Sequence, residues 1–544
     1  MQGLMMEMPL LITAIMKHAE RNHPTREIVS ITADNPLHRY TFADCFTRTR
    51  QVANVLASFG VSEDARIATM AWNDYRHLEL YFGIACSGRV CHTLNPRLFA
   101  EQLVYIINHA EDEVIFVDVT FVSILEEIAT QCPTVKAYVV MCDEATMPTT
   151  TLPNAHCYET LIGQASSEYD WPSLDENTAC GLCYTSGTTG NPKGALYSHR
   201  STVLHTYAQA LPDVMNISSL DCILPIVPMF HVNAWGFPFS GVMVGAKFVM
   251  PGPALSEPAV LADLVNNEQV TVSAGVPTVW LPVLKYVKEA GRDLKPLTRI
   301  AIGGSACPLS MMEEFRDRYG VSVIHAWGMT EMSPLGTVNN HKPTTIDFAG
   351  KDLQDHMQSA GRPVPGVEMK ITDDDGKELP WDGQAIGALK VRGPWVCRTY
   401  FKLDQENDAH EADGWFNTGD VCAINPDGFI RITDRTKDVI KSGGEWISSI
   451  DLENVAMGFP GVAEAAVIGA IHPKWQERPL LVIIKAEGCD VNREELLKYF
   501  DGRVAKWWIP DDVEFVDEIP HTATGKISKL QLREKFVDYK FPNS

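Results

Sequence analysis

Apolar residues recur at two different spacings through the first part of the chain, and this alternation predicts helices interleaved with strands. Residues 41–58 carry apolar side chains at helical spacing, whereas residues 66–71, 113–119 and 136–141 are short apolar runs of strand length. A second region of the same kind covers residues 202–309. Strands that alternate with helices in this way predict mostly parallel sheets covered by helices, which is the α/β class.

The alternation is interrupted in two places. Residues 147–175 are rich in Thr, Pro and Ser, so we predict a connector that lies outside the core. From Gly361 onward, short apolar runs are separated by frequent Gly, Pro and Asp residues, which predicts a small β-rich unit.

The charged segment Asp434–Asp438 (DRTKD) lies between two apolar runs, and the pattern after it differs again. Helical spacing covers residues 451–457 and 492–507, with a strand predicted over residues 464–471. A chain of 544 residues is also too long for one compact core. We therefore predict a large N-terminal domain over residues 1–433, a hinge at residues 434–438, and a small mobile α+β C-terminal domain over residues 439–544.

Net charge and cysteine usage narrow the class of partner. The formal charge of -23 would repel a phosphate backbone, so nucleic acid is excluded as a partner. The apolar stretch at residues 234–246 ends at Lys247 and is shorter than the ~18 residues that a membrane span requires. Thirteen cysteines without framework spacing indicate the reducing cytoplasm, and the CxxC pair Cys180 and Cys183 is expected to be buried and unreactive.

The segment Tyr184–Gly194 (YTSGTTGNPKG) has the composition of a loop that holds an anion. Its glycines allow tight turns that bring backbone N–H groups together, its Ser and Thr residues add hydroxyl donors, and Lys193 adds a positive charge. The common phosphate-loop pattern GxxxxGK[ST] does not fit, because Pro192 precedes the lysine, and no GxGxxG pattern follows a strand elsewhere. Taken alone, the segment is also compatible with a polar surface loop.

Four further segments follow this loop along the chain: Ala326–Glu331 (AWGMTE), Thr418–Asp420 (TGD), Asp434–Asp438 and Thr524–Lys526 (TGK). In this order the five segments resemble the motifs of the adenylate-forming superfamily, which contains acyl-CoA synthetases, peptide-synthetase adenylation domains and beetle luciferases. The resemblance covers nearly the whole chain. It implies a ligase that activates a carboxylic acid with ATP and transfers the acyl group to CoA.

The resemblance implies an ATP site with a Mg²⁺ ion. The β- and γ-phosphates would be held by Thr185, Ser186, Gly187, Thr188, Thr189, Gly190 and Lys193. Thr185 and Glu331 would contact Mg²⁺, which prefers oxygen ligands, and Thr330 would donate to the α-phosphate. Asp420 would accept hydrogen bonds from the ribose hydroxyls, and Arg435 would reach the ribose or the phosphate. The walls of the adenine pocket would be Gly303, Gly304, Ser305, His325, Ala326, Trp327 and Gly328.

The same resemblance divides catalysis into two half-reactions. Lys526 would neutralise negative charge as the carboxylate attacks the α-phosphorus and pyrophosphate leaves. The C-terminal domain would then rotate about Lys437 and bring Ser442, Gly443 and Gly444 to the tunnel through which the CoA thiol arrives. Lys441 and Trp446 would lie close to the adenylate, although a packing role for Trp446 stays open.

His231 and Trp235 are the candidate residues of the acyl pocket. Their segment Met229–Gly236 (MFHVNAWG) has no Asp that could pair with an α-amine, so a plain acyl chain is expected. His231 would lie beside the acyl carboxylate, with a core histidine as the alternative, and Trp235 resembles the aromatic gate of medium- and long-chain fatty acyl-CoA synthetases. The chain looks most like medium-chain fatty acyl-CoA ligases and 3-methylmercaptopropionate-CoA ligases. A short- to medium-chain or methylthio acid is therefore expected.

Other functions stay open at this point. A longer-chain fatty acyl-CoA synthetase and a luciferase-type oxygenase would share the same ATP motifs. A non-catalytic sensor of acyl-adenylates would need neither Lys526 nor Glu331, and a kinase would release ADP in place of AMP and pyrophosphate. A homodimer is expected by analogy with relatives alone.

Overall fold

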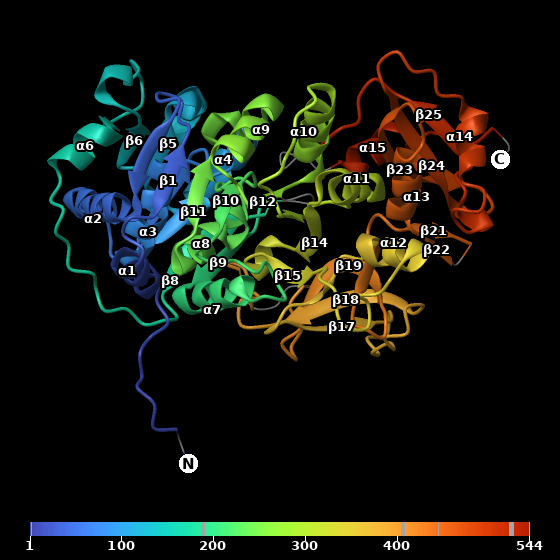
Figure 1. Ribbon diagram of the computed structural model, residues 1–544, viewed down its shortest axis with the longest axis horizontal. Coiled ribbons are helices and arrows are strands. Elements are labelled where there is room, and N and C mark those ends of the chain that lie inside the picture. Colours follow the sequence, from blue (N-terminus) through green and yellow to red (C-terminus); the bar gives the residue numbers. More distant parts are fainter. Residues whose placement is uncertain (2, 186–190, 404–408, 444, 522–526, 543–544) are drawn as a thin grey trace.

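Two large sheets and the helices around them form most of the molecule. The computed structural model describes residues 1, 3–185, 191–403, 409–443, 445–521 and 527–542, with the backbone alone at residues 445 and 446. In Figure 1 the two large sheets extend from the blue to the yellow part of the chain, a smaller orange sheet lies beside them, and the red C-terminal elements lie at the end away from the blue ones.

The first sheet has seven strands in the order β7-β6-β5-β3-β4-β8-β9, and every neighbouring pair is parallel except β8 and β9. Its strands are β3 (Arg66–Met70), β4 (Val90–Thr93), β5 (Asp112–Asp118), β6 (Ala137–Met141), β7 (Ala155–Cys157), β8 (Ala179–Tyr184) and β9 (Gly194–Ser198). The helices of this part of the chain are α1 (Ile12–Asn22), α2 (Phe42–Ser58), α3 (Tyr75–Cys86), α4 (Ala100–Ala110), α5 (Val122–Ile128) and α6 (Tyr158–Gln164). Strands β3, β5 and β6 confirm the three predicted apolar strands.

The second sheet has nine strands in the order β16-β15-β14-β13-β12-β10-β11-β1-β2. Its strands are β1 (Glu27–Ser30), β2 (His38–Thr41), β10 (Cys222–Pro225), β11 (Lys247–Met250), β12 (Val272–Gly275), β13 (Arg299–Ile302), β14 (Ser322–Gly328), β15 (Leu335–Val338) and β16 (Arg362–Pro363). Pairing is parallel from β14 to β1 and antiparallel at both edges. The accompanying helices are α7 (His199–Ala210), α8 (Phe237–Val244), α9 (Pro258–Asn267), α10 (Pro277–Glu289), α11 (Leu309–Tyr319) and α12 (Gly350–Gln358).

Helices α2 and α3 show why these segments fold as they do. The Thr41 side chain accepts a hydrogen bond from the Asp44 backbone N–H, and the Asp44 side chain accepts from the Thr41 backbone N–H, which fixes the start of α2. Every residue of α3 is buried. Gly83 permits the close approach of α2, because a Cβ there would lie 2.6 Å from Cγ1 of Val52. Among the helices of the described residues, none is long and apolar enough to cross a bilayer.

The last third of the chain contains two smaller sheets. The β-rich unit predicted after Gly361 is an antiparallel sheet of β17 (Glu368–Thr372), β18 (Ile386–Arg392), β19 (Phe416–Ile424) and β20 (Ile430–Arg435). The C-terminal domain contains β21 (Ile440–Ser442), β22 (Glu445–Ile447), β23 (Val462–His472), β24 (Gln476–Lys485), β25 (Asp512–Phe515), α13 (Ser449–Met457), α14 (Arg493–Tyr499) and α15 (Lys529–Lys535). The prediction of an α/β protein with a large N-terminal and a small C-terminal domain is confirmed.

Residues 147–175 are not the plain connector that their composition predicts. They contain β7, at the edge of the first sheet, and α6, whose Tyr158 and Ile162 are buried. Glu159 of α6 also accepts hydrogen bonds from Arg48 and Arg76, at 2.9 Å and 2.8 Å. The prediction was wrong because two apolar residues at helical spacing are enough to anchor a short helix when the surrounding Thr, Pro and Ser residues conceal the pattern.

Helix α15 is bonded to the segment predicted as the hinge. Lys529 is half-buried, and its Nζ lies 2.9 Å from Glu453 and 3.9 Å from Asp434. One turn later Arg533 donates to the backbone carbonyl of Asp438 at 2.9 Å. The start of α15 is held in turn by a hydrogen bond from Ser528 N–H to the carbonyl of Pro520, at 2.7 Å.

Asn73 joins the two large sheets where their strands end. This residue follows β3 of the first sheet, and its fully buried side-chain amide donates to the carbonyls of Pro225 and Val227, both at 2.8 Å, at the end of β10 in the second sheet. Its amide oxygen accepts from Met229 N–H at 2.6 Å. Three bonds therefore fix the course of the chain immediately before His231.

We predict that Asn73→Asp lowers the free energy of unfolding by roughly 3 kcal/mol or more, because it removes two donated bonds and leaves two buried carbonyls unpaired. Thermal unfolding followed by calorimetry measures the loss. Asn492→Asp is the matched control, since Asn492 is exposed and its oxygen caps α14, a role that Asp performs equally well. An unchanged melting temperature for Asn73→Asp would contradict the assigned role.

Candidate active site

The base of the glycine-rich loop is held by the hairpin of β8 and β9. Thr185 N–H donates to the carbonyl of Lys193 at 2.9 Å, and Lys193 N–H donates to Oγ1 of Thr185 at 3.2 Å. These two bonds bring Thr185 and Lys193 together at the mouth of the loop. Cys180 and Cys183 of β8 are buried and free, and burial raises the pKa of both thiols, as expected for unreactive cysteines.

Glu331 and Thr330 lie opposite this hairpin in the short 3₁₀ turn Thr330–Met332, where both side chains are buried. Tyr400 donates its hydroxyl to Oε1 of Glu331 at 2.7 Å, and Tyr197 of β9 donates to the carbonyl of Thr330 at 2.6 Å. Burial first, and then the negative charge of Glu331, raise the pKa of Tyr400, so its hydroxyl stays protonated as a donor.

Lys193 lies on the other side of Tyr400. Its Nζ is 5.0 Å from the centre of the Tyr400 ring, within the range of a cation–π interaction. Tyr400 thus touches both a cation of the glycine-rich loop and the carboxylate of Glu331, which lie far apart in the sequence.

Trp327, Asp420 and Arg435 form the second part of the site. The Trp327 indole N–H donates to Oδ2 of Asp420 at 2.8 Å, and Nε of Arg435 lies 2.7 Å from Oδ1 of the same carboxylate. Asp420 and Arg435 are directly opposite each other on β19 and β20, so strand register creates this ion pair. The charge of Asp420 is the main cause of the raised pKa of Arg435. Each carboxylate oxygen retains capacity for a further bond.

The strand and loop predicted to form the adenine wall pack backbone to backbone. Gly303 follows β13, and a Cβ there would lie 2.6 Å from the carbonyl of Ala326 on β14. Gly328 is equally restricted, because its Cβ would lie 1.9 Å from the carbonyl of Pro334. His325 contributes only backbone to this wall. Its buried ring bonds to the carbonyl of Ser359 at 2.9 Å, and burial lowers its pKa to about 4, so the ring is neutral at physiological pH.

Trp235 lies against the same wall. A methyl group at Gly303 would be 3.4 Å from Cη2 of Trp235, and one at Gly304 would be 3.8 Å from Cζ2. The candidate acyl residue Trp235 and the glycines predicted for adenine are therefore neighbours. Ser305 follows them in an exposed position.

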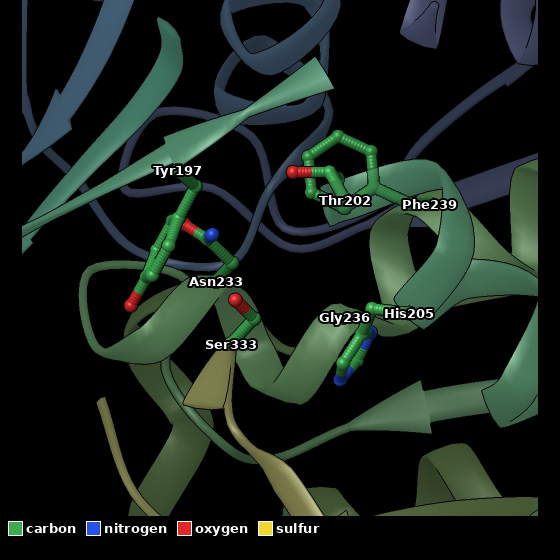
Figure 2. Close-up of a pocket in the computed structure, with 7 residues that line it drawn as sticks. All are labelled: Tyr197, Thr202, His205, Asn233, Gly236, Phe239 and Ser333. Carbon is green, nitrogen blue, oxygen red and sulfur yellow. The ribbon is translucent and has the colours of Figure 1, made fainter. Parts of the chain in front are cut away.

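The segment that carries Trp235 has an unusual backbone. Val232, Asn233, Ala234 and Trp235 have φ values of 46°, 52°, 46° and 56°. A left-handed helical conformation costs roughly 1–2 kcal/mol per non-glycine residue, so neighbouring groups must hold it in place. His231, immediately before the turn, is half-buried and in ordinary extended conformation. Figure 2 shows the pocket beside the turn, which Asn233 and Gly236 line.

The candidate CoA residues lie in β21 and the turn after it. Ser442 is fully buried and accepts a hydrogen bond from Arg478 at 3.2 Å. Gly443 has a φ of +61°, and a Cβ there would lie 3.1 Å from the Trp475 ring, so the turn requires glycine. Lys437 and Lys441 are exposed, and the Lys441 N–H donates to Glu477 at 3.0 Å.

Several predicted residues lie outside the described part of the chain. They are Ser186, Gly187, Thr188, Thr189, Gly190, Gly444 and Lys526, together with the side chain of Trp446. Their roles remain predictions.

Two tyrosines at the site are absent from the sequence motifs. Tyr400 and Tyr197 hold Glu331 and Thr330 through a hydroxyl, and neither belongs to one of the five segments. For Tyr197 the only available signal is its place three residues after Gly194 in a strand. Tyr400 has none, because it belongs to an irregular segment that the pattern of apolar residues does not mark.

Comparison of the sequence identifies the family. Residues 16–401 match the family described as AMP-binding enzyme, and residues 451–526 match the AMP-binding enzyme C-terminal domain. The medium-chain-fatty-acid–CoA ligase of Ectopseudomonas oleovorans is 50% identical over 538 residues, which cover 99% of this chain and 98% of that protein. The 3-methylmercaptopropionyl-CoA ligase of Ruegeria lacuscaerulensis is 50% identical over 542 residues, which cover 99% of both chains.

The structure is also similar to that of a solved CoA ligase. The anthranilate CoA ligase AuaEII in complex with anthranoyl-AMP superposes with a TM-score of 0.86 at 25% identity, over 97% of this chain and 98% of that one. The fold is thus that of an adenylate-forming enzyme. The chain belongs to the AMP-binding enzyme family, and the superfamily predicted from its five segments is confirmed.

We predict that Tyr400→Phe lowers kcat/KM for MgATP by about tenfold to a hundredfold, the value of one hydrogen bond to a charged group, because it frees the Glu331 carboxylate. The phenyl ring still lies beneath Lys193, so only the hydroxyl is tested. Tyr319→Phe is the control, since its buried hydroxyl has no partner among the described residues. Equal kinetics for both variants would contradict the role of Tyr400.

Proposed function

We propose that this enzyme is an ATP-dependent acyl-CoA ligase that joins a carboxylic acid to CoA through an acyl-adenylate and releases AMP and pyrophosphate. The observation that carries the proposal is the bonded group Trp327–Asp420–Arg435, which combines a flat aromatic wall with a buried carboxylate as nucleoside recognition requires. The two ligases of the same length at 50% identity support the same reaction class.

In the first half-reaction the chain's own residues position two anions. The proposed phosphate site combines the mouth of the glycine-rich loop, at Thr185 and Lys193, with Thr330. Asp420 accepts from the ribose hydroxyls with the capacity left after its bonds to Trp327 and Arg435. The substrate carboxylate, placed beside His231, attacks the α-phosphorus, and Lys526 neutralises the charge that builds up as pyrophosphate leaves.

Glu331 and Thr185 fit a Mg²⁺ ion by their chemistry. Both offer oxygen atoms, and in the described part of the chain Tyr400 binds only Oε1 of Glu331, so Oε2 is left for a ligand. Glu331 and Thr185 would hold the ion, and the ion would supply positive charge that offsets the charge of the phosphates.

For the second half-reaction we propose a rotation of the C-terminal domain. The hinge is placed at residues 434–438, with Lys437 as the pivot, and lies between the two ranges matched by the family. In the second pose Ser442, Gly443 and Gly444 line the approach of the CoA thiol, and the absence of side chains at the glycines leaves room for it. Lys441 and Trp446 approach the adenylate in this arrangement.

The proposed substrate is a short- to medium-chain acid or a methylthio-substituted acid such as 3-methylmercaptopropionate. His231 and Trp235 supply one polar and one aromatic wall, and a thioether resembles a methylene group in size and polarity. A longer-chain fatty acid is the alternative, and a luciferase-type oxygenase has no observation in its favour. We further propose that the enzyme acts in the cytoplasm and as a homodimer, by analogy with relatives.

A panel of carboxylates from acetate to hexadecanoate, with 3-methylthiopropionate included, tests the proposal with AMP release as the readout. We expect CoA-dependent AMP formation with a maximum at short to medium chains. ADP as the product would indicate a kinase and overturn the proposal, and a maximum at hexadecanoate would favour the alternative substrate.

We predict that Lys526→Ala slows acyl-adenylate formation by about 10²–10³-fold, because the developing charge loses its counter-ion. Thioester formation from supplied acyl-adenylate should continue at nearly the original rate. Isotope exchange between pyrophosphate and ATP measures the first step, and single-turnover release of acyl-CoA measures the second. Lys540→Ala serves as the surface control, and an equal loss in both steps would refute the separation into two poses.

A further inference from the structure

The turn Val232–Gly236 is five consecutive residues in the left-handed region of φ, ending with Gly236 at 83°. Four of them carry side chains, which seldom adopt such angles. A turn of this kind persists only where its surroundings determine it. The groups that contact its last two residues therefore decide where the Trp235 indole lies.

Helix α7 supplies those groups. The Gln209 side chain is 1% exposed, and its Nε2 donates to the backbone carbonyl of Trp235 at 2.9 Å. Its Oε1 is buried without a hydrogen-bond partner among the described residues. A buried amide with one unused oxygen is retained at a cost, which indicates that its donated bond to Trp235 matters.

His205, one turn earlier on α7, fills the space beside Gly236. A Cβ at Gly236 would lie 2.6 Å from Cε1 of His205 and 3.0 Å from Oε1 of Gln209. His205 is itself fixed by a hydrogen bond from Leu335 N–H to Nε2, at 3.3 Å. The end of the turn thus fits between two side chains of one rigid helix.

The turn also borders a small cavity, which Thr202 and His205 of α7 line together with Asn233, Gly236 and Ser333. In Figure 2, Asn233 and Ser333 lie around this cavity, and His205 lies beside Gly236. The space open to the centre of a water molecule is about 10 Å³, which is room for one water. Asn233 is held separately, because its amide oxygen accepts hydrogen bonds from the Tyr81 hydroxyl at 3.3 Å and the Cys183 thiol at 3.6 Å. The bond from Gln209 acts on the Trp235 end of the turn.

The turn matters because it determines where the Trp235 indole lies. With the turn in place, the edge of the Trp235 ring lies against Gly303 and Gly304. A return of residues 232–235 to ordinary negative φ values would change the direction of the Trp235 side chain and uncover these glycines. The bond from Gln209 opposes that change.

We propose that Gln209 is a positioning residue that holds Trp235 against Gly303 and Gly304 and thereby limits the length of the acyl chain that the enzyme accepts. This inference rests on the proposed function, since it requires Trp235 to border the acyl pocket. Gln209 acts through Trp235 and does not touch the substrate.

Gln209→Met tests the proposal, because methionine matches the length of glutamine and cannot donate the bond. The matched control is Thr206→Val, a buried change on the same helix that removes only a bond to the carbonyl of Thr202. Two quantities are measured on the full chain: amide hydrogen exchange of residues 229–237, and kcat/KM for decanoate relative to butyrate. We expect faster exchange in Gln209→Met alone, and a rise of about fivefold in the decanoate preference, the value of one ordinary hydrogen bond.

Each outcome of these two measurements tests a separate part of the proposal. Faster exchange with an unchanged chain-length preference would overturn the specificity role of Gln209, and unchanged exchange would overturn its role in holding the turn. Gln209→Asn, which withdraws the amide by one methylene, provides the same two measurements where the methionine variant does not fold. If no carboxylate supports AMP release, the proposed function fails, while the exchange measurement still reports on the bond to Trp235.

Discussion

The structure depends on how two parallel sheets meet at the ends of their strands. Asn73 makes that junction specific: its amide satisfies two carbonyls and one N–H of the other sheet, in a place where water is excluded. A buried backbone group without a partner is costly, so no apolar residue could take its place. The chain therefore leaves β10 in a fixed direction, and this direction determines where His231 and Trp235 lie.

The rest of the site also depends on contacts that fix the position of the backbone. Tyr400 and Tyr197 reach across from other segments to hold Glu331 and Thr330, and strand register places Arg435 opposite Asp420. Glycines at 303 and 328 allow strands and loops to approach at distances that a Cβ would forbid. Few charged groups take part in the site. The chain is strongly negative overall, so the positive potential that an anion requires is confined to the site itself.

Sequence patterns predicted the parts of this arrangement that are local. Short apolar runs gave β3, β5 and β6, and the turn-rich composition after Gly361 gave the four-stranded antiparallel sheet. The five motifs placed the chain in its family, which the full-length relatives confirm. Contacts between distant segments could not be predicted, as with Tyr400 and Glu331, because no periodicity encodes which irregular segment will face which. Helix α6 was not predicted for the opposite reason. Its two buried apolar residues are close in the sequence, but two residues are too few to form a recognisable pattern.

The bonds between α15 and residues 434–438 have a mechanical consequence. Lys529 and Arg533 tie the helix to Asp434 and Asp438, and Ser528 closes the base of the segment that contains Lys526. Asp434 precedes Lys437 and Asp438 follows it. In the proposed rotation about Lys437, the bond from Arg533 to Asp438 would keep α15 with the C-terminal domain, whereas the ion pair of Lys529 with Asp434 would have to break.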